Sequence, residues 1–97
     1  MAEFDPDTQL RLAEVRLGLD TERFLKTPVG SYLLVRAEHD AQDAIDRLKT
    51  VEPTDVNAVR KAQSDALLVE RFLACLNDAI LNGRNAEEQL EQNHLEA

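Results

Sequence analysis

His39 and Asp43, four residues apart, come nearest in this sequence to a metal-binding pair. Positions i and i+4 share one face of a helix, so an imidazole nitrogen and a carboxylate oxygen could point at the same ion. A stable site needs three or four ligands, and the only other histidine, His94, lies in the C-terminal tail. The sequence therefore predicts no metal site and no cofactor.

A ridge of carboxylates surrounds this pair, with aspartates recurring every third residue. One interpretation is a solvated helix face, balanced by Arg60 and Lys61 from a neighbouring helix. The other is a surface that engages a basic partner. The residues of this acidic surface are Glu38, Asp40, Asp43 and Asp46.

Cys75 is the only cysteine, and its neighbours Ala74 and Leu76 favour a small buried apolar residue over a reactive thiol. The three glycines are too few and too scattered for a nucleophile elbow, a phosphate-binding loop or a dinucleotide fingerprint. Nothing marks a walled pocket that would separate the pKa values of two carboxylates. We therefore expect no catalytic residues and a non-enzymatic protein.

Composition excludes further classes of protein. The 97 residues suffice for one domain, and 11 basic against 19 acidic residues give a net charge of −8. That charge disfavours nonspecific binding to nucleic acid or to an anionic membrane. No apolar run approaches the ~20 residues of a membrane span, and the first residues do not resemble a signal peptide. One cysteine cannot form an internal disulfide, so we expect a cytoplasmic protein.

The apolar spacing is helical throughout, which predicts an all-α fold. Residues 6–26 favour one or two short helices, with a break at Gly18 and Asp20. Thr27 caps a helix over about 28–50, where Pro28 takes the first position. The predicted single domain has three parts: short N-terminal helices over 1–27, a helical hairpin over 28–83, and an acidic tail or short helix over 84–97.

The hairpin follows from two heptad patterns joined by a short turn. Alternating spacings of three and four residues run from Leu34 to Val51 and again from Val59 to Gly83. Pro53 marks the turn, Thr54 caps a second long helix over about 55–82, and Gly83 stops it. Two long helices joined by four residues lie antiparallel. Reflection about the turn pairs Ala44 with Ala62, Ala41 with Ala66 and Leu34 with Leu73.

The base of the hairpin is apolar on nearly every side between residues 67 and 81. A helix that is apolar all round must be surrounded. The N-terminal helices can cover one face with Leu10, Leu17, Phe24 and Leu25, but a chain of this size buries only ~60–65% of the surface that its unfolded form exposes. We therefore expect a homo-oligomer. The residues expected to associate are Leu67, Leu68, Phe72 and Leu81.

Residues 24–83 resemble a group of small helical proteins of tailed phages and prophages. The similarity rests on the run from Phe24 to Leu33, on Arg36–Glu38, on Leu48 with Val51–Asp55, and on later single positions. Those later positions are Gln63, Phe72, Leu76, Ala79, Ile80 and Gly83. The resemblance implies a phage origin and a non-enzymatic role, and it transfers no active-site residue.

Three functions remain open. The first is a structural or accessory phage component, in the virion or in packaging, that binds copies of itself or a phage partner. The second is an inhibitor of a host defence protein, whose acidic surface would fill a basic nucleic-acid groove. The third is a nucleotide sponge with a pocket between oligomer helices. Its phosphate-holding candidates are Arg23, Lys26, Arg36 and Arg71.

Overall fold

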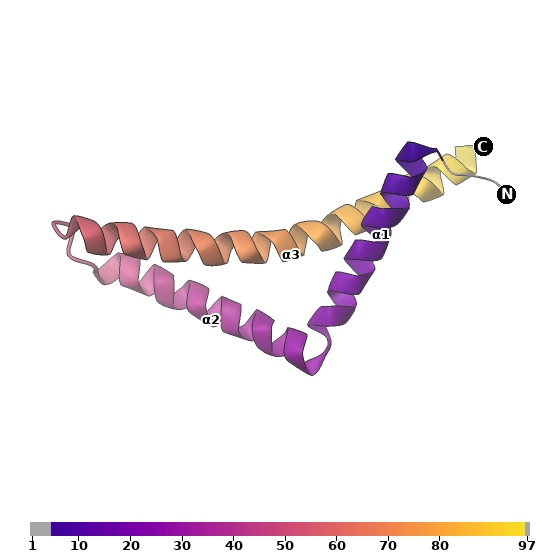
Figure 1. The fold of residues 1–97 in the computed structure, drawn as a ribbon. Helices are drawn as coiled ribbons and strands as arrows, with labels where there is room; N and C mark the ends of the chain where they lie inside the picture. The colour runs from indigo at the N-terminus through magenta and orange to yellow at the C-terminus, as the bar shows by residue number, and fades with distance from the viewer. Residues whose placement is uncertain (1–4, 97) are drawn as a thin grey trace.

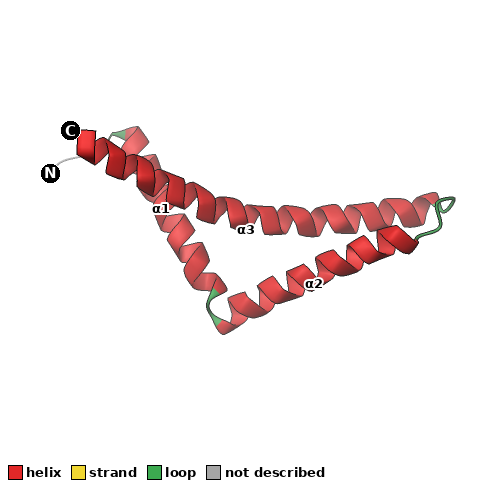
Figure 2. Ribbon diagram, turned by 180° about the vertical axis from the view of Figure 1, so that it is seen from behind, coloured by secondary structure: helices red, strands yellow, loops and turns green. Residues whose placement is uncertain are grey.

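The computed structural model describes residues 5–96, and three helices account for almost all of them. They are α1 (Pro6–Leu25), α2 (Pro28–Thr50) and α3 (Val56–Glu96), drawn in Figure 1 and, from behind, in Figure 2. No strand occurs among the described residues, so the predicted all-α class is confirmed.

Helix α1 begins at Pro6, and Asp5 is its N-cap residue. The Asp5 carboxylate accepts a hydrogen bond from the Thr8 amide at 2.7 Å, and Pro6 occupies the first turn. This satisfies one of the amides that a helix start leaves without a partner. The helix then continues for 20 residues without interruption. The predicted break at Gly18 and Asp20 is therefore wrong, and one long helix replaces the short ones.

The corner between α1 and α2 is built by Thr27. Its hydroxyl donates to the Phe24 carbonyl at 2.6 Å and accepts from the Gly30 amide at 3.0 Å, so it closes one helix and caps the next. Pro28 lies in the first turn of α2, as predicted, and α2 ends at Thr50. The bounds of α2 thus agree with the prediction over 28–50.

The second connection, residues 51–55, differs from the prediction in its cap. The Asp55 carboxylate accepts from the Ala58 amide at 3.1 Å, so Asp55 and not Thr54 caps α3. Helix α3 also continues through Gly83 to Glu96, a length of 41 residues. No described glycine has a positive φ, so the left-handed stop expected at Gly83 does not form. The predicted tail over 84–97 is, up to Glu96, the last part of α3.

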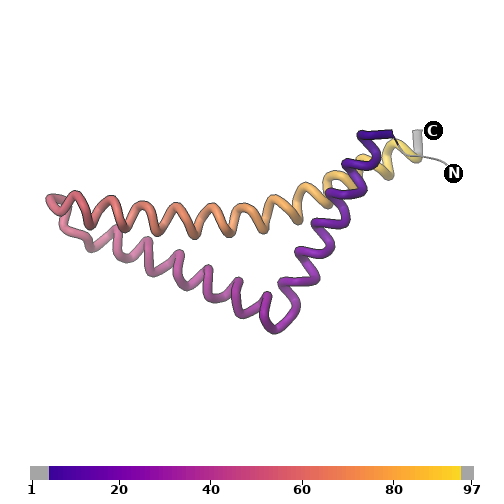
Figure 3. The backbone as a smooth tube through the Cα atoms, in the orientation of Figure 1, coloured from indigo at the N-terminus to yellow at the C-terminus, as the bar shows by residue number. Residues whose placement is uncertain are grey.

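The three helices form an open triangle (Figures 1 and 3). Helices α2 and α3 lie together near their connection and separate toward the other end of α2, where α1 returns to cross α3. The chain measures 64 × 29 × 21 Å, and its radius of gyration is 19.3 Å. A compact chain of this length would have a radius of gyration of about 13 Å. The arms of the predicted hairpin therefore meet near the tip and not along their whole length.

Only small residues are buried within the described part of the chain. The buried apolar side chains are those of Ala44, Ala62 and Ala86, with exposed fractions of 0%, 5% and 1%. None of the large side chains is fully buried. Small residues let helix axes approach closely, but the apolar area that such contacts remove from water is small.

The cap at Asp5 gives a testable pH dependence. Hydrogen bonds from Thr8 lower the pKa of Asp5 below its ordinary value, because they stabilise the carboxylate. A lowered pKa adds stability that is present above the ordinary pKa and is lost as the pH falls through the lowered one. We expect the Thr8 amide resonance to shift with this titration in an NMR series from pH 6 to pH 2. In Asp5→Asn the cap should persist and the Thr8 titration should vanish; an unchanged titration would assign it to another group.

Candidate association surface

Two glycines form the crossing of α1 and α3. A Cβ built on Gly18 would lie 2.9 Å from the Ala79 carbonyl oxygen and 3.0 Å from the Gly83 Cα. A Cβ on Gly83 would lie 2.9 Å from the Glu14 carbonyl oxygen. The two backbones therefore touch without side chains between them. The sequence pattern suggested a break and a stop at these glycines, whereas the structure places them at a helix contact.

An ion pair lies next to this crossing. The Arg84 guanidinium is 3.1 Å from a Glu22 carboxylate oxygen, and its Nε donates to the same oxygen at 3.2 Å. Ala86, one turn further along α3, is buried. The α1–α3 contact thus combines close backbone packing with one ion pair between side chains, of which the Arg84 member is two-thirds exposed.

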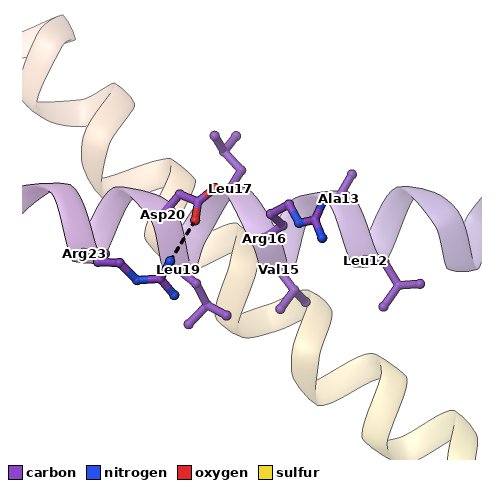
Figure 4. Close-up of a pocket in the computed structure, with 8 residues that line it drawn as sticks. All are labelled: Leu12, Ala13, Val15, Arg16, Leu17, Leu19, Asp20 and Arg23. Carbon is purple, nitrogen blue, oxygen red and sulfur yellow. Dashed lines mark hydrogen bonds and ion pairs between the residues drawn. The ribbon is translucent and has the colours of Figure 1, made fainter.

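Because Gly18 is the residue of α1 that contacts α3, the leucines of α1 lie on either side of this contact. Leu10 and Leu17 are 57% and 59% exposed, and Leu12 and Leu19 are 41% and 48% exposed. Figure 4 shows Leu17 pointing away from the side on which Leu12, Val15 and Leu19 lie. A shallow groove follows this helix. It is lined by Leu12, Ala13, Val15, Arg16, Leu17, Leu19, Asp20 and Arg23.

The residues predicted to associate lie on two sides of α3. Leu68 and Phe72, 70% and 47% exposed, share one side, while Leu67 and Leu81, 46% and 49% exposed, fall on the far side by helical spacing. Cys75 is exposed next to Phe72, so the expectation of a buried cysteine is wrong. The apolar neighbours Ala74 and Leu76 favoured burial, but the exposed thiol shows that no other helix covers α3 at Cys75.

Helix α2 adds further exposed apolar surface near its start. Val29, Tyr32 and Val35 are each more than 60% exposed, and Leu33 is 41% exposed. The separation of α2 from α3 in Figures 1 and 2 explains this exposure, because the predicted covering contact needs helices that stay together. All three helices therefore present apolar side chains to solvent.

Three carboxylates of the acidic surface, those of Asp40, Asp43 and Asp46, have partners within their own helix. The Arg36 Nε donates to the Asp40 carboxylate at 3.2 Å, and the Gln42 amide donates to Asp46 at 3.0 Å. The bond to Asp40, and then that with Tyr32, raises the pKa of Arg36. Across the hairpin, Arg47 lies 3.1 Å from Asp65. The cross-hairpin cation is thus Arg47, in place of the predicted Arg60 and Lys61.

One cluster in the described part of the chain has the residue types of a metal site. Single ligand atoms of His39, Asp40 and Asp43 lie within 4.8 Å of one another on the surface of α2. The His39 Nδ1 is 3.4 Å from Asp43, and Arg36 already binds Asp40. These are ordinary contacts between residues three and four apart on a helix. They supply no walled site and no polar group that lacks a partner.

None of the described helices combines the length and the apolar character needed to cross a membrane. Comparison of the chain with protein families, with curated proteins and with solved structures gives no match.

Proposed function

We propose that this protein is a non-enzymatic component of a protein assembly, and that it associates with copies of itself through its exposed apolar side chains. The observation that carries the proposal is that, among the described residues, no large side chain is fully buried while fifteen large apolar side chains are exposed. Ordering a helix costs roughly 1–2 kcal/mol of conformational entropy per residue. Among the described residues only alanines are buried apolar side chains, and the larger ones are at most partly buried, so a partner surface would add the burial that offsets this cost.

The exposed area supports the same proposal. The chain exposes 7759 Å², whereas a compact protein of its mass would expose about 5,600 Å². The excess, about 2,200 Å² per chain, is of the order buried in permanent interfaces and exceeds the ~800 Å² that each partner buries in a standard complex.

Within this proposal the protein is an accessory or structural component, the role implied by the resemblance of residues 24–83 to small tailed-phage proteins. The alternative, an inhibitor that fills a basic groove, has less support, because Asp40, Asp43 and Asp46 already have partners on their own helix. The third candidate, a nucleotide sponge, also has less support. Of its candidate cations, Arg23 is paired with Asp20 and Arg36 with Asp40.

Sedimentation equilibrium and thermal unfolding at increasing concentration test the proposal. From about 1 to 200 μM, we expect a mass that is a multiple of 10.9 kDa and a Tm that rises with protein concentration, since association stabilises the folded chain by mass action. A helical chain that stays a monomer over this range, with a constant Tm, would contradict self-association.

A charge placed on the apolar surface should dissociate the assembly. Phe72→Asp buries a carboxylate wherever Phe72 is covered, and we expect the dissociation constant to rise roughly 100-fold, which corresponds to about 3 kcal/mol. Gln63→Asp is the matched control, because it adds the same charge at an exposed polar position of α3. Equal dissociation constants for the two variants would exclude Phe72 from the interface.

A further inference from the structure

We propose that the middle of α3 is covered by the middle of α3 from a second copy, with the two helices crossing antiparallel. The residues concerned are Leu68, Phe72 and Cys75, here named the mid-helix stripe. The inference rests on the proposed self-association and specifies its surface, its occupant and its orientation.

The mid-helix stripe continues a surface that is already used for helix packing. Its spacings of four and three residues extend to Ala79, to the exposed Asn82 at the edge of the contact with α1, and to Ala86. Helix α1 covers that continuation: the Ala79 carbonyl faces Gly18, and Ala86 is 1% exposed. Toward the tip, the same side of α3 is uncovered, with Leu68 70% exposed. The stripe is therefore a helix-packing face that lacks its second helix.

The area left exposed argues for a second copy as the occupant. One docked peptide helix would bury only a part of the excess of about 2,200 Å². A second copy brings an equal excess of its own, so that each chain covers the other. In a two-fold contact the same patch serves both partners, and the mid-helix stripe, apolar at its three positions, is complementary to itself.

The distribution of charge along α3 argues for the antiparallel orientation. Residues 56–75 contain three basic and two acidic side chains, whereas residues 76–96 contain one basic and five acidic side chains. Antiparallel helices bring the acidic half of each copy toward the other copy's less acidic half. Parallel helices would place the two acidic halves next to each other, which is unfavourable.

The position of α1 determines where the two copies of α3 can cross. Because α1 occupies this side of α3 from Ala79 onward, a second α3 cannot lie alongside the full helix and must cross it near Phe72. Helices that pack by their i±4 ridges cross at an angle of about 50°, which carries the partner's ends away from α1. A two-fold axis beside Phe72 places Cys75 next to the partner's Leu68 and holds the two Cys75 thiols apart.

Crosslinking through the native cysteine tests this arrangement. In Leu68→Cys, oxidation of the assembled protein with diamide should join Cys75 to the new thiol of the other copy, each disulfide giving two electrons and two protons to diamide. We expect nearly complete covalent dimer in Leu68→Cys and little in the wild type. Leu67→Cys is the matched control, since Leu67 is exposed on the far side of α3, and it should behave like the wild type.

The outcomes separate this inference from the proposed function. Equal crosslinking of Leu68→Cys and Leu67→Cys, with a wild type that sediments as an oligomer, would overturn the stripe pairing and leave self-association intact. Rapid Cys75–Cys75 crosslinking in the wild type would overturn the antiparallel orientation. A monomeric wild type would overturn both proposals.

Alkylation of the unmodified protein provides a test without any variant. We expect iodoacetamide to modify Cys75 about tenfold more slowly when about nine-tenths of the chains are assembled than at monomeric dilution, because only free chains expose the thiol. A rate that does not change with assembly would overturn coverage of the stripe, even if Leu68→Cys fails to fold.

Discussion

Replacing Gly30 by alanine is expected to open the corner between α1 and α2 and to cost about 3 kcal/mol or more of stability. A Cβ at Gly30 would overlap the carbonyl oxygen of Phe24 and would lie 2.6 Å from the carbonyl carbon. Both atoms are backbone, so no side chain can rotate away. The same carbonyl accepts the Thr27 hydroxyl bond, and a shift would therefore disturb the α2 cap as well.

Urea unfolding at a fixed protein concentration, followed by circular dichroism, measures the effect of Gly30→Ala. Ser31→Ala is the control, because Ser31 is the next residue of the same turn and is exposed. Alanine raises helix propensity most when it replaces glycine, by about 1 kcal/mol. Propensity alone therefore predicts that Gly30→Ala stabilises the protein, and a midpoint at or above that of Ser31→Ala would contradict the close contact.

Gly83→Ala provides a second test in which propensity and packing predict opposite signs. In a helix that met no neighbour, the change would stabilise the protein by about 1 kcal/mol. Here the added Cβ would lie 2.9 Å from the Glu14 carbonyl oxygen and 3.0 Å from the Gly18 Cα, so α1 must move away from α3. Overpacking of this kind costs about 1–3 kcal/mol, and we expect net destabilisation with weakening of the Arg84–Glu22 pair.

Asn82→Ala is the matched control for Gly83→Ala. Asn82 is exposed and adjacent on α3, and alanine there should be neutral or slightly stabilising. A double variant, Gly18→Ala with Gly83→Ala, should cost less than the sum of the single costs, because α1 moves away once for both. Exact additivity would indicate that the two glycines do not face each other.

The start of α2 was predictable because its signals are local. Thr27 and Pro28 are adjacent, one with an oxygen that caps an amide and the other with a backbone angle that suits a first turn. Neither needs information about the rest of the chain. The cap of α3 is Asp55, one residue after the predicted Thr54. Both side chains can accept a hydrogen bond from a backbone amide, and the geometry of the turn decides which of them does.

The glycines at 18 and 83 were misread because their role depends on tertiary contact. A glycine that ends a helix and a glycine that admits another helix look alike in sequence, and they differ in φ and in their neighbours. Both residues here have helical backbones and face each other from 65 positions apart. Because Gly83 does not end the helix, the C-terminal segment continues α3 to Glu96.

The apolar surface was predictable in part. Leu68 and Phe72 are predicted to associate from the excess of apolar positions around α3; the structure shows that both are exposed, and their association stays a prediction. The flanking leucines of α1 were assigned instead to cover the hairpin, because Gly18 was not seen as the contact point. A contact through glycine leaves neighbouring side chains outside it, and only the crossing geometry shows this.

The open triangle also governs how the molecule moves through water. Its radius of gyration, 19.3 Å, is that of a compact protein of about 300 residues. A single chain should thus leave a gel-filtration column earlier than a globular protein of its own mass, because its extended shape raises the hydrodynamic radius. If two copies fill each other's open triangles, the dimer is more compact than its monomers. Its elution volume should then differ from that of the monomer by far less than for a globular protein that dimerises.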